Sequence, residues 1–213
     1  RRGSTSRADP RWNSGRQKRY PSISAVTPAF LGDAGLNSTI PMHEIVYVTF
    51  SDAIAATHIA SGPEHTCAAF ANGGVRCWGV GPEGRLGTNS TETVDGTASL
   101  GYIAFSAADF AVKVAASATN SCMLTILGRI RCWGDHNAGI IGDTSITEEL
   151  GDDPGEMALS VYVPFTESVP VVHVDMGEEH ACALFADSQI RCWGQNGEGQ
   201  LGIESGDDRI DAS

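Results

Sequence analysis

The sequence lacks the short motifs by which most active sites are recognised. It has no G-x-S-x-G nucleophile elbow, no phosphate-binding loop and no dinucleotide-binding fingerprint. His43, His58, His136 and His173 stand without a partnering pattern. The sequence therefore predicts no enzyme, no catalytic residue and no cofactor.

Long hydrophobic runs are missing as well. A membrane-spanning helix needs about 20 apolar residues, whereas the stretch 98–117 is interrupted by Asp109 and Lys113. We therefore expect no membrane span. The chain also lacks a leader of signal-peptide type, so we expect that it has been processed or is part of a longer protein.

Positive charge is scarce beyond residue 19. Residues 1–19 hold seven of the 14 basic residues and one acidic residue, a balance of +6, so the rest of the chain carries 7 basic against 25 acidic residues, or −18. This acidic body argues against nucleic acid as a partner, because such binding needs clustered positive charge. The basic arm is either a solvated tail or binds an anionic surface, such as the acidic body of its own or a neighbouring copy. Its candidate interface residues are Trp12, Arg16, Lys18 and Arg19.

One stretch of the sequence is written three times. Residues 67–87, 122–142 and 182–202 share the pattern C-x7-[VI]-R-C-W-G-x4-G-x-[LI]-G. Nine specified positions at identical spacing indicate a repeat architecture. The period of 55 and then 60 residues suits a four-stranded propeller blade. The predicted fold class is all-β, a partial β-propeller of about three four-stranded blades with an extended N-terminal arm.

Each copy contains two cysteines placed symmetrically around a turn. Residues equally far from a tight reversal face each other across an antiparallel hairpin, close enough for a disulfide. The predicted disulfides are Cys67–Cys77, Cys122–Cys132 and Cys182–Cys192. Such bonds indicate an oxidising compartment. Together with the glycosylation sequons at Asn37 and Asn89, they favour an extracellular or secreted protein.

A tryptophan follows the second cysteine of every copy and points to the opposite face of the strand. Trp78, Trp133 and Trp193 are predicted to pack between neighbouring blades, because a large ring placed once per repeat suits that role. The other interpretation is that these rings stack on sugars.

These motifs resemble the regulator of chromosome condensation repeat family, whose blades place Gly and His before a small residue or Cys and continue with W-G-x-N-x-x-G-Q-L-G. The matching residues are His65-Thr66-Cys67 with Trp78-Gly79, and His180-Ala181-Cys182 with W-G-Q-N at 193–196 and G-Q-L-G at 199–202. The middle copy departs, because Ser117 replaces the glycine and Asn120 the histidine. The resemblance covers residues 55–205 and implies a β-propeller. Its cysteine-bearing form looks like an extracellular branch of the family.

The two H-x-C pairs, His65 with Cys67 and His180 with Cys182, fall on one strand face, as zinc ligands can. Disulfides account for every sulfur and the middle copy has Asn120, so no metal site is predicted. The acidic clusters at 152–156 and 207–211 are interpreted as solvated loops, because neither follows EF-hand spacing.

Three blades do not close a ring, because a closed propeller needs at least about four. An open arc exposes apolar faces at both ends, and such edges are capped or continued. We divide the chain into a basic N-terminal arm (1–19), an extended segment or degenerate blade (20–54) that is suited to strand addition on a neighbouring copy, and the three repeats (55–213).

We therefore expect a non-enzymatic extracellular protein that self-assembles into an oligomer or, where the rotation does not close, a filament. One alternative is a secreted or receptor-ectodomain module that binds a protein or a glycan. The other is guanine-nucleotide exchange on a small GTPase, which the family resemblance implies.

Overall fold

The computed structural model describes residues 47–106, 109–166, 168–204 and 207–208. The chain divides into two units, Arg1–Val46 and Tyr47–Ser213, and every described residue belongs to the second. The predictions for the basic arm and for most of the segment 20–54 fall outside the described residues. The same holds for Trp12, Arg16, Lys18, Arg19 and Asn37.

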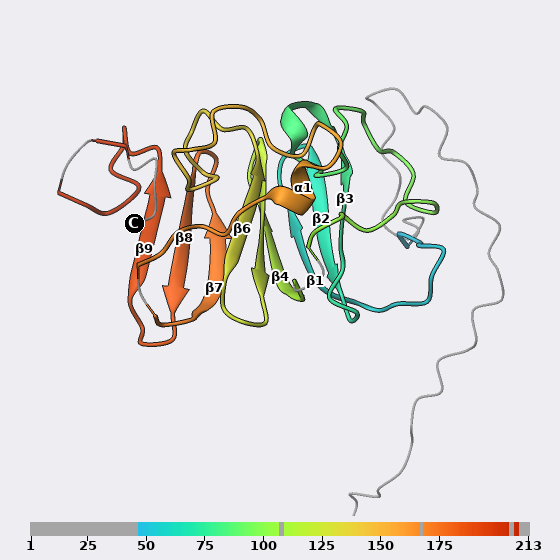
Figure 1. Cartoon of the computed structure of the whole chain (residues 1–213), viewed down its shortest axis with the longest axis horizontal. Coiled ribbons are helices and arrows are strands. Elements are labelled where there is room, and N and C mark those ends of the chain that lie inside the picture. The colour runs from blue at the N-terminus through green and yellow to red at the C-terminus, as the bar shows by residue number, and fades with distance from the viewer. Residues whose placement is uncertain (1–46, 107–108, 167, 205–206, 209–213) are drawn as a thin grey trace, which may run out of the picture. The chain divides into compact units, whose positions relative to one another are not determined.

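Three antiparallel sheets of three strands follow one another along the chain and are seen from blue-green to red in Figure 1. The first sheet contains β1 (Ala56–Ser61), β2 (His65–Phe70) and β3 (Val75–Gly79). The second contains β4 (Ala111–Ala116), β5 (Asn120–Thr125) and β6 (Ile130–Gly134), and the third contains β7 (Val171–Met176), β8 (His180–Phe185) and β9 (Ile190–Gly194). Helix in the described residues is limited to η2 (Pro82–Gly84) and α1 (Glu156–Leu159). The fold is all-β, as predicted.

The three sheets share one strand register. In each, the first cysteine of the copy lies directly opposite the second. The first strand pair of each sheet also shifts register at an equivalent place, between Ala56 and His58, Ala111 and Lys113, and Val171 and His173. The repeated sequence therefore forms the same unit three times, including its irregularity.

Each hairpin turn holds one residue in the left-handed region, six positions after the first cysteine. These residues are Gly73 (φ +81°), Gly128 (φ +72°) and Ser188 (φ +72°). Glycine adopts this conformation without a steric cost, whereas serine does not. The amide of each donates to the carbonyl three residues earlier, at 2.8, 2.9 and 3.0 Å. These tight turns place the two cysteines of every copy symmetrically.

The expectation of four strands in each blade is wrong for the described residues, where each sheet has three. In the first blade an irregular segment takes the fourth position and meets β3 at two points. Val94 pairs with Gly79, and the Ile103 amide donates to the Val75 carbonyl at 2.9 Å. Between these points the sequence D-G-T-A-S-L-G is poor in strand formers. The segment therefore bulges away instead of continuing the ladder.

The second blade repeats this arrangement beside β6. Leu150 pairs with Gly134, and the Val163 amide donates to the Ile130 carbonyl at 2.9 Å. The intervening residues contain G-D-D-P-G and α1, so they also leave the plane of the sheet. The outer segments still cover the third strand of their blades.

The hydrophobic core lies between the sheets. We call the side of each sheet that carries the disulfide its cysteine face, and the other side its tryptophan face. One cluster joins Cys67 of the first blade to Trp133 of the second. The next joins Cys122 of the second blade to Trp193 of the third. Each internal interface therefore packs a cysteine face against the tryptophan face of the following blade.

Candidate functional site

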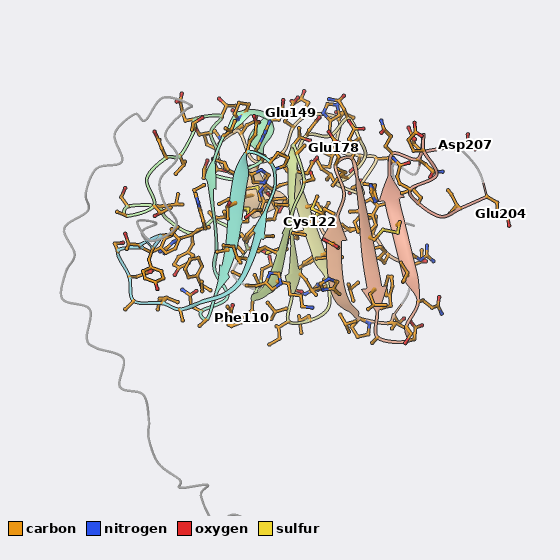
Figure 2. All side chains as sticks on the ribbon, turned by 180° about the vertical axis from the view of Figure 1, so that it is seen from behind. Phe110, Cys122, Glu149, Glu178, Glu204 and Asp207 are labelled. Carbon is orange, nitrogen blue, oxygen red and sulfur yellow. A yellow bond between two sulfur atoms is a disulfide. The ribbon has the colours of Figure 1, made fainter. Side chains whose placement is uncertain are left out.

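The six cysteines form three disulfides, one in each hairpin, as the spacing predicts. The S–S distances are 2.03, 2.06 and 2.07 Å from the first blade to the third. Figure 2 shows Cys122 midway between the rim that carries Glu149 and Glu178 and the opposite rim, which carries Phe110. The bonds therefore fasten the hairpins in the middle of the sheets, where the blades pack together.

Two of the three repeated tryptophans bind the preceding blade. Trp133 and Trp193 are fully buried. Their indole N–H groups donate to the carbonyl oxygens of Arg85 (3.1 Å) and Ile140 (2.9 Å). These acceptors occupy equivalent positions, eight residues after the second cysteine of the preceding blade. Trp78 is only half-buried, because the described residues contain no blade before the first.

A buried arginine before the second cysteine was part of the repeat pattern, but the sequence analysis gave it no role. In the second blade, Arg131 pairs with Asp109 at 3.0 Å, and their side chains are 6% and 1% exposed. The guanidinium also lies 4.1 Å from the ring centre of Tyr162, whose hydroxyl donates to Asp109. The trio ties the segment before β4 to the outer segment after β6.

The first blade contains the same trio. Arg76 donates to both carboxylate oxygens of Asp52, at 3.0 and 2.6 Å, and lies 3.9 Å from the ring centre of Tyr102. The hydrogen bond from Arg76 lowers the pKa of Asp52, against the opposing effect of burial. Asp52 belongs to the segment 20–54 of the sequence analysis, yet it completes this trio.

A phenylalanine precedes each trio and packs edge-on against the blade. Phe50 lies 5.0 Å from Phe70, Phe105 lies 5.4 Å from Trp133, and Phe165 lies 5.1 Å from Phe185, measured between ring centres. The sequence carries a signal for this contact that was missed. F-S-D, F-S-A-A-D and F-T-E begin at residues 50, 105 and 165, ahead of the three repeats.

His65 lies at the first internal interface and is 3% exposed. The Ser121 hydroxyl donates to the Arg85 carbonyl at 2.9 Å, so it accepts from the His65 Nε2–H at 2.8 Å. The Nδ1 atom of His65 is buried without a partner. Burial, and secondly the charge of Arg85, lower the pKa of His65 to about 4, because a second ring proton would have no acceptor.

The low pKa of His65 predicts a pH-dependent stability. Between pH 6.5 and about 4 the unfolded chain takes up a proton that the folded chain refuses, so stability falls as the pH falls through this window. The loss is about 3 kcal/mol, from a shift of about two and a half pKa units. His65→Asn, which copies Asn120, removes this contribution. Urea unfolding at pH 7, 6, 5 and 4 should show a smaller pH dependence for the variant, and parallel curves would contradict the assignment.

The H-x-C pairs have other partners in the structure. Cys67 and Cys182 are in disulfides, and His65 binds Ser121. In the acidic cluster at 152–156, the Glu156 carboxylate accepts from the backbone amides at positions 151 and 153, at 2.8 and 3.0 Å, and so closes a turn.

One other cluster has metal-ligand chemistry among the described residues. The ligand atoms of Asp135, His136 and Glu149 lie within 4.8 Å of one another, and all three side chains are partly exposed. The Asp135 carboxylate already accepts from the backbone and side chain of Asn137, at 2.9 and 2.7 Å. We assign no ion to this cluster.

The sequon residue Asn89 is partly buried and has φ +58°. Its amide donates to the Gly151 carbonyl at 2.9 Å, and its side-chain oxygen is buried. Glycosylation there stays a prediction.

Two surface hollows of about 420 and 170 Å³ lie beside the outer segments of the blades. The larger is lined by Arg129, Tyr162 and Phe165 among others, and the smaller by Asn89 and Tyr102 among others. The described lining residues of both include no histidine, cysteine or acidic side chain. We therefore looked for the functional surface elsewhere.

The third blade ends on an uncovered cysteine face. Ile190 is 67% exposed, whereas the equivalent Val75 and Ile130 are 0% exposed. Leu184 and the Cys182–Cys192 disulfide on the same face are half-buried. No other described residue covers this face in the way that the outer segments and following blades cover its equivalents.

The first blade begins on a partly uncovered tryptophan face. Ile59 in β1 is 62% exposed, whereas the equivalent Val114 and Val174 are 1% and 3% exposed. Trp78 and Thr66 lie on the same face and are half-buried. The candidate functional surfaces are therefore these two end faces, one of each kind.

Comparison with known proteins agrees with the repeat and the fold. The family model of the regulator of chromosome condensation (RCC1) repeat matches residues 56–85 and 171–200, which are the first and third copies. Human WBSCR16 superposes with a TM-score of 0.62 at 22% identity, over 75% of this chain and 39% of that one. Yeast RCC1 (Prp20) bound to Kap60 superposes with a TM-score of 0.58 at 18% identity, over 74% and 36%. The chain therefore contains RCC1 repeats, and its blades form part of an RCC1-type β-propeller.

Curated relatives share this region alone. The X-linked retinitis pigmentosa GTPase regulator of Canis lupus familiaris is 27% identical over 150 residues, which are 70% of this chain and 14% of that protein. The probable E3 ubiquitin-protein ligase HERC4 of Homo sapiens is 30% identical over 156 residues, 71% of this chain and 13% of that protein. The chain thus spans about a seventh of the length of these relatives. Within the described residues, no helix is long and apolar enough to cross a membrane.

Proposed function

We propose that this chain is a non-enzymatic, extracellular interaction module whose copies associate through their end faces into an oligomer or a filament. The observation that carries the proposal is the exposure of Ile59 and Ile190, whose equivalents in the other two blades are buried. Terminal faces of repeat arrays need a cap or a further repeat, because each repeat buries its apolar surface against its neighbours.

A second copy supplies what each end lacks. The third blade presents a cysteine face and the first blade presents a tryptophan face. These two kinds of face already meet twice inside the chain. Association of copies would therefore repeat an interface that the sequence forms twice.

Charge favours a contribution from the basic arm. Residues 1–19 carry +6 and the remaining chain −18, so the arm of one copy is attracted to the acidic body of another. Trp12, Arg16, Lys18 and Arg19 are the proposed contacts, and strand addition by residues 20–54 would strengthen them.

The three disulfides support an extracellular setting, because such bonds persist in oxidising compartments. Glycans at Asn37 and Asn89 belong to the same proposal. Treatment of the native protein with a peptide-N-glycosidase is expected to lower its mass, and an unchanged mass would remove this part.

The proposal is tested by the native mass of the oxidised chain, measured by light scattering across a range of concentrations. The wild type is expected to assemble, and Ile190→Lys to associate at least about tenfold more weakly, because it loses about 1.5–3 kcal/mol of apolar burial. Removing residues 1–19 is expected to weaken assembly most at low salt. Ile126→Lys, at an exposed hairpin tip (64%) away from both faces, is the matched control. A wild type that stays monomeric at every concentration would contradict the proposal.

Binding of a different protein is the second candidate, because RCC1-type propellers are known in such complexes. Yeast RCC1 (Prp20) was solved bound to Kap60, and the structure of Prp20p from Saccharomyces cerevisiae is described with its binding to Gsp1p and histones. Recognition of another extracellular protein or a glycan by the propeller surface remains the alternative to self-assembly. Nucleotide exchange on a small GTPase is the least favoured candidate, and a nucleotide-release assay would detect it.

A further inference from the structure

The first internal interface shows how a cysteine face recognises the next blade. The Arg85 carbonyl accepts from Ser121 (2.9 Å) and from the Trp133 indole (3.1 Å), and the Ser121 hydroxyl accepts from His65 (2.8 Å). One histidine and one carbonyl of the first blade therefore bind one hydroxyl and one indole of the second.

The second internal interface lacks the histidine and also lacks the hydroxyl. Asn120 replaces the histidine and donates to carbonyls of its own blade, those of Trp133 (3.3 Å) and Asp135 (2.6 Å). The residue equivalent to Ser121 in the third blade is Ala181, which is fully buried. The contact from the Trp193 indole to the Ile140 carbonyl is kept. The hydroxyl is thus present where the histidine needs an acceptor and absent where it does not.

The two free ends carry the matching halves of the first arrangement. His180 lies on the open cysteine face and has no side-chain hydrogen bond to any described residue. Thr66, which is equivalent to Ser121, lies on the open tryptophan face, where its hydroxyl donates only to Ser61 at 3.2 Å. Trp78 is half-buried beside it, and Gln200 is the third-blade equivalent of Arg85.

We propose that copies join head to tail, with His180 of one copy donating to the Thr66 hydroxyl of the next and the Trp78 indole donating to the Gln200 carbonyl. This inference rests on the proposed function and fixes which faces meet and in which register. Because the two faces differ, the contact is heterologous, and it builds a closed ring or an open filament according to the rotation between copies.

Complementation tests the pairing of faces. Ile190→Lys blocks the cysteine face and Ile59→Lys blocks the tryptophan face, and both positions are exposed enough to accept lysine in the folded monomer. Each variant alone is expected to stay monomeric, whereas an equimolar mixture forms a dimer with one intact interface. If each variant alone still forms a dimer, like faces meet and the proposal is overturned. A mixture that stays monomeric while the wild type assembles overturns it as well.

The register is tested by Thr66→Val and His180→Ala in the otherwise wild-type chain. Each is expected to weaken assembly about 2- to 12-fold, the range for one net hydrogen bond. The double variant should weaken it no further, because both remove the same contact. Thr144→Val at an exposed position is the control. Additive losses, or none, would overturn the register. A monomeric wild type would instead refute the proposed function itself.

Discussion

Reduction of the three disulfides is expected to unfold the blades at temperatures where the oxidised chain is folded. Each bond closes a loop between cysteines ten residues apart. In the chain-entropy model such a loop stabilises the fold by about 2–3 kcal/mol. Three of them together approach the total stability of a typical domain, about 5–15 kcal/mol. The melting temperature, measured with and without reductant, checks this, and equal values would show that the bonds do not hold the blades.

Removal of single disulfides should separate the entropic part from the packing part. The three loops have equal length, so the chain-entropy loss is the same for each. The Cys122–Cys132 bond is buried between two blades, however, whereas Cys182–Cys192 is half-buried on the open end face. Replacement of the first pair by alanine should therefore cost more, because it also leaves a cavity. Equal losses for the two pairs would contradict this assignment of the buried and open faces.

Replacement of Arg131 by methionine is expected to lower the free energy of unfolding by about 3–5 kcal/mol. The change leaves the Asp109 carboxylate, 1% exposed, buried without its cation. It also removes the donors to Ser160 and Ser106, each at 3.1 Å. Urea unfolding at pH 7 measures the loss.

Two further variants control the Arg131 experiment. Arg129→Met removes a guanidinium that also stacks on Tyr162, at 4.0 Å. Because Arg129 is exposed, this variant should cost only about 0.5–1 kcal/mol. Asp109→Asn combined with Arg131→Met should recover part of the loss, since no buried charge is left unpaired. A loss at Arg131 no larger than that at Arg129 would show that the buried ion pair does not stabilise the blade.

The features that the sequence predicted well are those with a fixed local geometry. The cysteine pairs could be derived because a symmetric hairpin places them opposite each other, and Trp133 and Trp193 because strand alternation turns them away from the sulfurs. The pairing of unlike faces follows from the same alternation.

The features that were missed depend on segments without a regular period. The outer segments 94–103 and 150–163 cover the third strands through two contacts each, which leaves no strand pattern to recognise. Asp52 and Phe50 lie well before the first cysteine, and their distance from it differs from that of Asp109 and Phe105 in the second blade. A search based on fixed spacing therefore did not connect them with the repeat.

Hydroxyl-radical footprinting of the native protein, in dilute solution and in the assembled state, tests the central claim most directly. Ile190, Ile59 and Trp78 are expected to be labelled in the dilute chain and protected in the assembly. Ile126 and Leu127, 64% and 60% exposed at a hairpin tip, should be labelled equally in both states. If the assembled protein leaves Ile190 and Ile59 as reactive as the dilute chain does, the end faces do not join the copies.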